Sequence, residues 1–153
     1  MTTIINLENG AKAEIDEENN IIIGTYGEIL TADMTAQVYI TGLRFVQKIG
    51  AENLRGIIFD FRQVKRFSRD NLPAAQSESY RANRNDTLEH IPVAMIVETP
   101  VQEQMVRISM QSTPGKHRKR IVRSREEGYA FITEWHNKTT AEIAKLEEED
   151  NHN

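Results

Sequence analysis

Two short apolar runs alternate with segments of helical periodicity in the second half of the chain. The runs cover residues 56–61 (GIIFDF) and 92–98 (PVAMIVE), and each is bounded by polar or helix-breaking residues. Apolar runs of this length suit strands that are covered on both faces, and strands separated by helices pair in parallel. A third, shorter strand is predicted at 119–123. The pattern therefore predicts a parallel sheet with helices packed on it.

The first 30 residues predict antiparallel strands instead. Apolar side chains alternate over 4–7 and 11–15, on either side of the dipeptide Asn9-Gly10, and a third segment runs from 21 to 29. Asn-Gly between alternating segments is typical of a hairpin. The expected fold class is α/β, with a mixed sheet whose N-terminal strands are antiparallel and whose later strands are parallel and alternate with helices.

Helices are predicted between and after these strands. Residues 30–50 place apolar side chains at helical spacing, with Thr31 as the N-cap and Gly50 at the C-terminal end. Thr99-Pro100-Val101-Gln102 matches a capping box that opens a helix ending near 113. A second such box begins at Ser124 and opens a helix whose apolar face continues to Leu146. Residues 68–84 predict a surface helix.

The chain has 153 residues, enough to bury one hydrophobic core. We expect a single domain over 1–147, followed by an acidic, flexible tail over 148–153. Cysteine is absent, which excludes disulfides and thiolate metal sites. No segment has the composition of a secretion signal or a membrane span, so a cytoplasmic protein without a membrane partner is expected.

The order of these elements resembles a known family. A strand pair, GEILTADM opening a long helix, GIIFDF followed by Val64 and Phe67, and a final strand leading into REEGYAFITEW are similar to the SpoIIAA-like proteins of the broader STAS class (sulphate-transporter and anti-sigma-factor-antagonist domains). The resemblance covers about residues 20–137. It implies a SpoIIAA-like fold and a role in binding a protein partner.

The resemblance does not carry over the regulatory serine of the family. In STAS antagonists, the strand that ends in aspartate is followed by an Asp-Ser-Ser-Gly-like turn, in which a serine is the phosphorylation switch. Setting Asp60 on the strand aspartate places Ser68 at the aspartate of the turn and Arg69 at the phosphorylated serine. A serine kinase cannot phosphorylate an arginine, so no residue here inherits the switch.

The loop after residue 61 is the first candidate site. A helix start and a group of cations could bind a phosphate-bearing ligand or an acidic protein surface, with Asp60 as a nearby acid. The alternative is that Ser68 or Asp70 caps the helix and the cations point into water, and we favour this alternative. The candidate anion-binding residues are Arg62, Lys65, Arg66, Ser68 and Arg69.

A second basic cluster covers residues 115–125. It belongs to a region, 55–125, with a net charge of +7, whereas the rest of the chain carries −11. The cluster could contact nucleic-acid phosphates, or it could be an edge strand that charge protects from aggregation. Parallel strands would put it at the opposite rim of the sheet from loop 62–70, so we do not expect a nucleic-acid partner. The candidate contacts are Lys116, Arg118, Lys119, Arg120 and Arg123.

The sequence offers little for catalysis. The four histidines, at 90, 117, 136 and 152, form no metal-ligand spacing, and no nucleophile elbow or phosphate-binding glycine loop is present. We therefore expect a non-enzymatic regulatory or protein-interaction module, without cofactor or metal. A small anionic-ligand binder using rim 60–70 is the alternative, and a weak nucleic-acid binder is third. The protein partner is unknown, and the N-terminal hairpin and the last helix are candidate homodimer surfaces.

Overall fold

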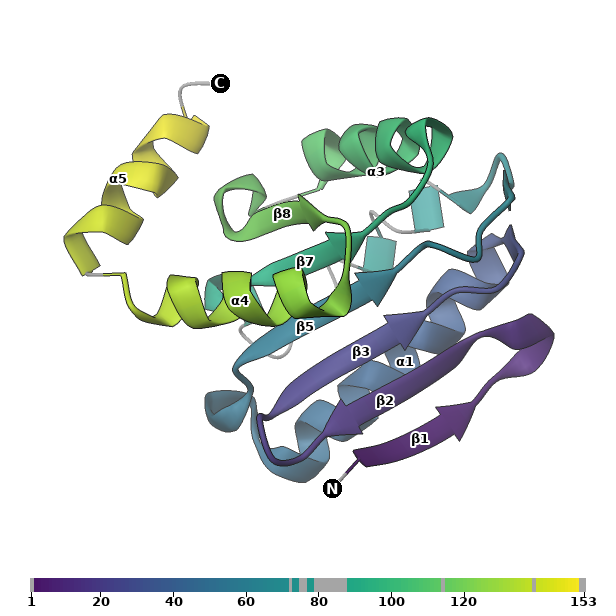
Figure 1. Ribbon diagram of the computed structural model, residues 1–153, viewed down its shortest axis with the longest axis horizontal. Helices are drawn as coiled ribbons and strands as arrows, with labels where there is room; N and C mark the ends of the chain where they lie inside the picture. The colour runs from purple at the N-terminus through teal and green to yellow at the C-terminus, as the bar shows by residue number, and fades with distance from the viewer. Residues whose placement is uncertain are drawn as a thin grey trace.

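A six-stranded mixed sheet, in the order β1-β2-β3-β5-β7-β8, forms the centre of the protein (Figure 1). The structure is a computed structural model that describes residues 2–71, 73, 74, 77, 78, 88–113, 115–138 and 140–151. The strands are β1 (Thr2–Asn6), β2 (Lys12–Asp16), β3 (Ile21–Thr25), β5 (Gly56–Asp60), β7 (Val93–Ile96) and β8 (Lys119–Val122).

Both halves of the sheet have the predicted direction. Strands β1, β2 and β3 pair antiparallel, whereas β3, β5, β7 and β8 pair in parallel. The turn between β1 and β2 places Asn9 and Gly10 at φ values of 59° and 83°, a left-handed conformation that asparagine and glycine tolerate best. The mixed α/β fold class expected from the sequence is confirmed.

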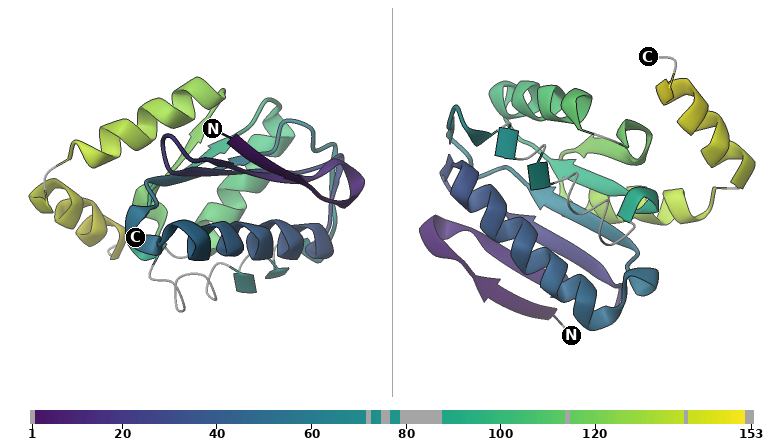
Figure 2. Two further views of the ribbon diagram at one scale, coloured as in Figure 1. Left: turned by 90° about the horizontal axis from the view of Figure 1, so that it is seen from below. Right: turned by 180° about the vertical axis from the view of Figure 1, so that it is seen from behind.

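Helices cover both faces of this sheet (Figure 2). Helix α4 (Arg125–His136) lies on one face, and α1 (Ala32–Ile49) and α3 (Pro100–Ser112) lie on the other. Helix α5 (Thr140–Asn151) follows α4, and short 3₁₀ turns occur at Ala51–Asn53, Leu88–His90 and Lys116–Arg118.

The predicted caps of these helices are present. Thr31 accepts a hydrogen bond from the backbone of Met34, and Thr99 and Gln102 form a complete capping box at the start of α3. Ser124 accepts from Glu127 N at 3.1 Å, but the Glu127 carboxylate reaches the backbone of Arg123 rather than that of Ser124. Local hydrogen bonds thus start each of the three helices where the sequence placed them.

Strand alternation divides the core into two layers. On the α4 side, Ile58, Ala94 and Ile96 are completely buried and pack with Phe131, Ile132 and Trp135. On the other side, β5 and β7 contribute Phe59, Met95 and Val97, against α1 and α3. Ile143 and Leu146 of α5 pack at the edge of the first layer, as their helical spacing predicted.

Three segments differ from the expectation. The third strand ends at Thr25, and Ile29–Leu30 (β4) instead pairs in parallel with Arg66–Phe67 (β6) in a separate two-stranded sheet. Helix α4 ends at His136, so residues 124–146 form two helices rather than one. Residues 148–151, where we expected a tail, continue α5, and Asp150 bonds to His117. Most of the predicted helix over 68–84 lies outside the described residues.

The packing of α4 on β5 gives a test of this arrangement. A Cβ on Gly56 would come within 2.5 Å of Cδ1 and 2.7 Å of Cγ1 of Ile132, a stiff and buried side chain. We expect Gly56→Ala to lower the free energy of unfolding by about 1–3 kcal/mol in urea denaturation.

Gly42→Ala is the matched control. In α1 the added methyl group would meet only Ile22 Cγ2, at 3.8 Å. Alanine favours the helix, so this change should stabilise the protein by about 0.5–1 kcal/mol. Equal effects of the two substitutions would contradict the close approach of α4 to β5.

Candidate functional site

The end of β5 holds a closed ion pair. Asp60 is only 5% exposed. Its carboxylate accepts hydrogen bonds from Arg62 N and Nε at 3.0 Å and from Arg62 Nη2 at 2.8 Å. This bidentate contact raises the pKa of Arg62. Asp60 and Arg62 are therefore engaged with each other, and Arg62 does not point into a cavity.

The remaining candidates of this loop do not converge on one point. Lys65 pairs with Glu28 at 3.2 Å, and both side chains are largely exposed. The Ser68 hydroxyl bonds to the Asp70 carboxylate, which also accepts from Ala32 N. Arg66 and Arg69 are exposed and make no ion pair with the described residues. An anion at this loop would meet these two arginines without help from Arg62.

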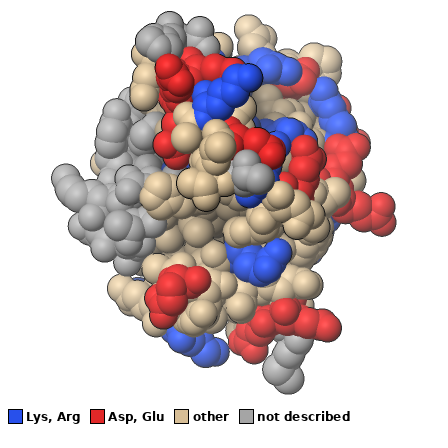
Figure 3. All heavy atoms as spheres, turned by 90° about the vertical axis from the view of Figure 1, so that its left-hand side faces the viewer, with Lys and Arg blue, Asp and Glu red and all other residues tan. Residues whose placement is uncertain are grey.

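The second basic cluster divides between the two faces of the sheet. Arg120 lies over the Phe131 ring and near Glu134, Arg123 pairs with Glu103 at 2.8 Å, and Arg118 is buried and donates to Ile91 O. Lys119 points to the opposite face from Arg120, and Lys116 is exposed. On the side of the molecule in Figure 3, basic and acidic side chains are interleaved. The cluster is therefore not one basic surface.

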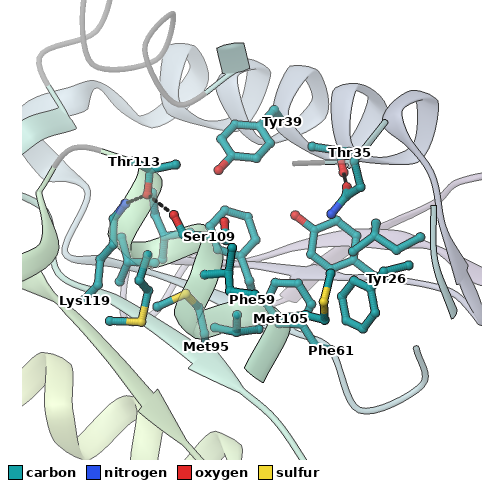
Figure 4. Close-up of a pocket in the computed structure, with 18 of the residues that line it drawn as sticks. Tyr26, Thr35, Tyr39, Phe59, Phe61, Met95, Met105, Ser109, Thr113 and Lys119 are labelled. Atoms are coloured by element: carbon teal, nitrogen blue, oxygen red, sulfur yellow. Dashed lines mark hydrogen bonds between the residues drawn. The ribbon is translucent and has the colours of Figure 1, made fainter. Parts of the chain in front are cut away.

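A cavity lies on the other face of the sheet, between the strands and helices α1 and α3 (Figure 4). Its volume is about 100 Å³. Its floor comes from β5, β7 and β8 and its walls from α1 and α3, and it also includes residues near β4 and β6. The described lining residues with polar side chains are Tyr26, Thr35, Tyr39, Asn71, Ser109, Thr113, Arg118 and Lys119.

Aromatic rings and thioethers make most of this pocket apolar. The Phe59 ring stacks against Tyr39 at 5.4 Å between centroids and against Tyr26 at 6.0 Å, while Phe61 lies 4.9 Å from Tyr26. Met95, Met105 and Met110 also line the space. Methionine adapts to irregular shapes and contacts aromatic rings favourably, so these walls suit a flat or flexible apolar group.

Two tyrosine hydroxyls face this space without a protein partner. Figure 4 shows the oxygens of Tyr26 and Tyr39 directed into the cavity, and neither forms a hydrogen bond within the described part of the chain. Tyr26 is only 3% exposed. Burial raises the pKa of Tyr39 to about 12 and the pKa of Tyr26 well above its ordinary value. Both groups are therefore neutral donors at physiological pH.

Lys119 places an amine at the edge of the same pocket. Its Nζ donates to Thr113 Oγ1 at 2.7 Å, and the Thr113 hydroxyl donates onward to Ser109 O at 2.9 Å. Burial, with a smaller contribution from the neighbouring Arg118 charge, lowers the pKa of Lys119 to about 7. The lysine predicted as a nucleic-acid contact is thus half-buried, and its amine faces the pocket.

This pocket was not predicted from the sequence. Tyr26 and Tyr39 belong to the N-terminal half, whereas Ser109, Thr113 and Lys119 follow 70 residues or more later in the chain. The signal that could have placed Lys119 in the pocket is the alternation of side chains along β8. It puts Lys119 and Ile121 on one face of the sheet and Arg120 and Val122 on the other. Among the described residues, no group of three or more metal-ligating side chains occurs, and no helix is long and apolar enough to cross a membrane.

No protein-family model and no curated protein matches this chain. Among solved structures, the chain is similar to the crystal structure of an uncharacterised DUF3478-family protein from Shewanella loihica PV-4, described as having a SpoIIAA-like fold. The two share 13% sequence identity, and the match covers 86% of this chain and 92% of the other, with a TM-score of 0.49.

The Asp60–Arg62 pair predicts a stability effect at the end of β5. Asp60→Ala removes the acceptor of three hydrogen bonds, so we expect the free energy of unfolding to fall by about 1–3 kcal/mol; the partial exposure of Arg62 limits the loss. Urea denaturation measures this change. Arg66→Ala, in the same loop, should change stability by less than about 0.5 kcal/mol. An equal effect of both substitutions would show that the pair is not structural.

Lys119 predicts a stability effect that depends on pH. Below pH about 7 the folded state holds Lys119 as an ammonium ion, and the free-energy cost of desolvating this charge is fully present. Between that pH and the ordinary lysine pKa of 10.5, the folded state has lost this proton while the unfolded state keeps it, so the free energy of unfolding rises with pH. Lys119→Met should therefore raise the free energy of unfolding by roughly 1–3 kcal/mol near pH 6, and by less near pH 9.

The control for this change is Lys116→Met, because Lys116 is exposed. It should leave the pH dependence of unfolding unchanged. If Lys119→Met raised the free energy of unfolding by the same amount at both pH values, the amine would not be buried as a charge.

Proposed function

We propose that this domain is a non-enzymatic binding module that takes a small, largely apolar ligand in the pocket between the sheet and helices α1 and α3. The observation that carries the proposal is the Tyr26 hydroxyl, which belongs to a residue only 3% exposed, is directed into the pocket and has no hydrogen-bond partner among the described residues. A polar group that lines an apolar pocket without a protein partner can donate its hydrogen bond to a bound ligand.

The lining supports a ligand with an apolar body and an oxygen acceptor. Aromatic and methionine side chains contribute much of the lining, and the tyrosine hydroxyls are the donors that could fix the orientation of the ligand. A few polar groups in a mainly apolar concavity are typical of small-molecule sites. The volume of about 100 Å³ is smaller than the roughly 150 Å³ of an apolar cavity that accepts benzene, so a ligand of one ring enters only where the methionine side chains adapt their shape.

Two observations support the non-enzymatic part of the proposal. Asp60, the acid at the carboxyl end of a parallel strand, is held by the Arg62 guanidinium and is not free to act as a general base. The tyrosines that face the pocket have raised pKa values and so are poor nucleophiles at neutral pH. We therefore assign the site to binding, through which a ligand would regulate the domain.

The pairing of Arg62 with Asp60 also weighs against the alternative of an anion site at rim 60–70. Of the four cations in that loop, one is bound to Asp60 and another to Glu28. We therefore place the ligand in the pocket.

A second candidate function is self-association through β1. This strand is the outer strand of the sheet, and its sequence, TTIIN, contains no charge or proline to protect its free edge. Ile4 and Ile5 are 49% and 40% exposed. Antiparallel pairing of two copies would lay uncharged strands against each other and continue the sheet, so a second copy of this chain is the partner we favour.

The pocket proposal predicts binding of a neutral aromatic probe. Benzyl alcohol should shift the amide NMR signals of pocket residues in α1 and α3, with a millimolar dissociation constant, because its hydroxyl can accept from a tyrosine while its ring enters the cavity. Ser109→Phe should fill the pocket and weaken binding at least about tenfold, whereas Gln104→Phe, an exposed position of the same helix, should not. Equal binding to both variants would contradict the location.

The β1 proposal predicts a dimer in sedimentation experiments. Ile4→Lys would bring like charges together across the two-fold axis, so it should shift the protein to the monomer. Ile40→Lys, at an exposed position of α1, introduces the same charge elsewhere and should leave the dimer intact. A wild-type protein that sediments as a monomer at high concentration would refute self-association.

A further inference from the structure

Lys119 enters the pocket because of the strand register. In the parallel pair β7–β8, Lys119 lies opposite Val93 and Ile121 opposite Met95, so the lysine shares the sheet face of these pocket residues. One N–H of its amine is used by Thr113. The other two have no partner among the described residues, and Figure 4 shows the amine at the opposite end of the cavity from Tyr26.

The surroundings of Lys119 differ from those of several other cations in this domain. Lys12 and Arg125 pair with Glu14, Arg62 with Asp60 and Arg123 with Glu103. No carboxylate pairs with Lys119 in the part of the chain that the structure describes. A half-buried cation without a counter-ion is poorly solvated, and this desolvation, together with the neighbouring Arg118 charge, lowers its pKa.

We infer that the ligand of this pocket is a small apolar carboxylic acid, bound with its carboxylate against Lys119 and its apolar body over Phe59 and the methionines. This inference rests on the proposed ligand pocket and adds the charge of the ligand to it. A carboxylate supplies the missing counter-ion and accepts the remaining N–H groups of the amine. An amine of the same size would instead place a like charge beside Lys119 and the neighbouring Arg118.

The pH dependence of binding follows from the groups that face Lys119. The charged neighbour is Arg118, and the side chain in contact at the C-terminal end of α3 is the neutral Thr113. Tyr39, on α1, remains a neutral phenol. The charge of the Glu78 carboxylate contributes to the raised pKa of Tyr39. Arginine keeps its proton at all relevant pH values, so Lys119 is the group that titrates near neutrality. Carboxylate affinity should therefore fall as the pH rises above about 7.

Three probes with one ring and different head groups test the inference: benzoate, benzyl alcohol and benzylamine. Their dissociation constants are measured by NMR titration of the wild-type protein near pH 6. We expect benzoate to bind about tenfold more tightly than benzyl alcohol, and benzylamine to bind most weakly. The advantage of benzoate should shrink near pH 9, where the amine is neutral.

Lys119→Met is the decisive variant, and its fold is checked by the same spectra. It should bind benzoate no better than benzyl alcohol, because the cation that pairs with the carboxylate is gone. Lys116→Met, which changes the same charge on the surface, should keep the preference for benzoate.

The outcomes separate the two proposals. If benzyl alcohol and benzoate bind the wild-type protein equally, the assignment of a carboxylic acid is wrong and the pocket stands. If the preference for benzoate survives in Lys119→Met, Lys119 is not its cause and the inference is likewise wrong. If none of the three probes binds, the ligand pocket itself is refuted and the inference with it.

Discussion

The burial of β5 on both faces is the constraint on which the rest of the structure depends. This strand pairs in parallel with β3 and β7, and its side chains alternate between two core layers. Ile58 is completely buried under α4, while Phe59 forms part of the pocket floor beneath α1. A central parallel strand cannot expose either face, so helices must cover both, and the placement of α1, α3 and α4 follows.

The pocket is a consequence of how the second layer is filled. On the α4 side, isoleucine, alanine and tryptophan side chains pack densely, and Gly56 and Gly128 let the helix approach closely. On the other side, long aromatic and methionine side chains span a wider space between the sheet and two helices. Their polar ends, the hydroxyls of Tyr26 and Tyr39, are directed into the pocket, where no described residue accepts their hydrogen bonds but a bound molecule or water could.

Local features of the structure were accessible from the sequence, whereas the candidate site was not. Thr31, Thr99 and Ser124 cap their helices as predicted, because a cap needs only residues within one turn. Strand β6 escaped prediction because two residues in a polar loop carry no periodicity, and they become a strand only beside β4. Lys119 was interpreted as a surface cation because composition shows a basic cluster but not which side of the sheet each member occupies.

The amino-acid sequence alone determines the mixed α/β class, the succession of helices and strands along the chain and the starts of the main helices. These properties follow from hydrophobic period, turn dipeptides and capping residues, which act over a few neighbouring positions. Only the tertiary structure decides that Arg62 closes on Asp60, that Arg120 and Lys119 point to opposite faces, and that tyrosines and a lysine from distant segments share one pocket. The physical reason is that burial and charge pairing depend on which elements pack together, and β-sheet register sets that across the whole chain.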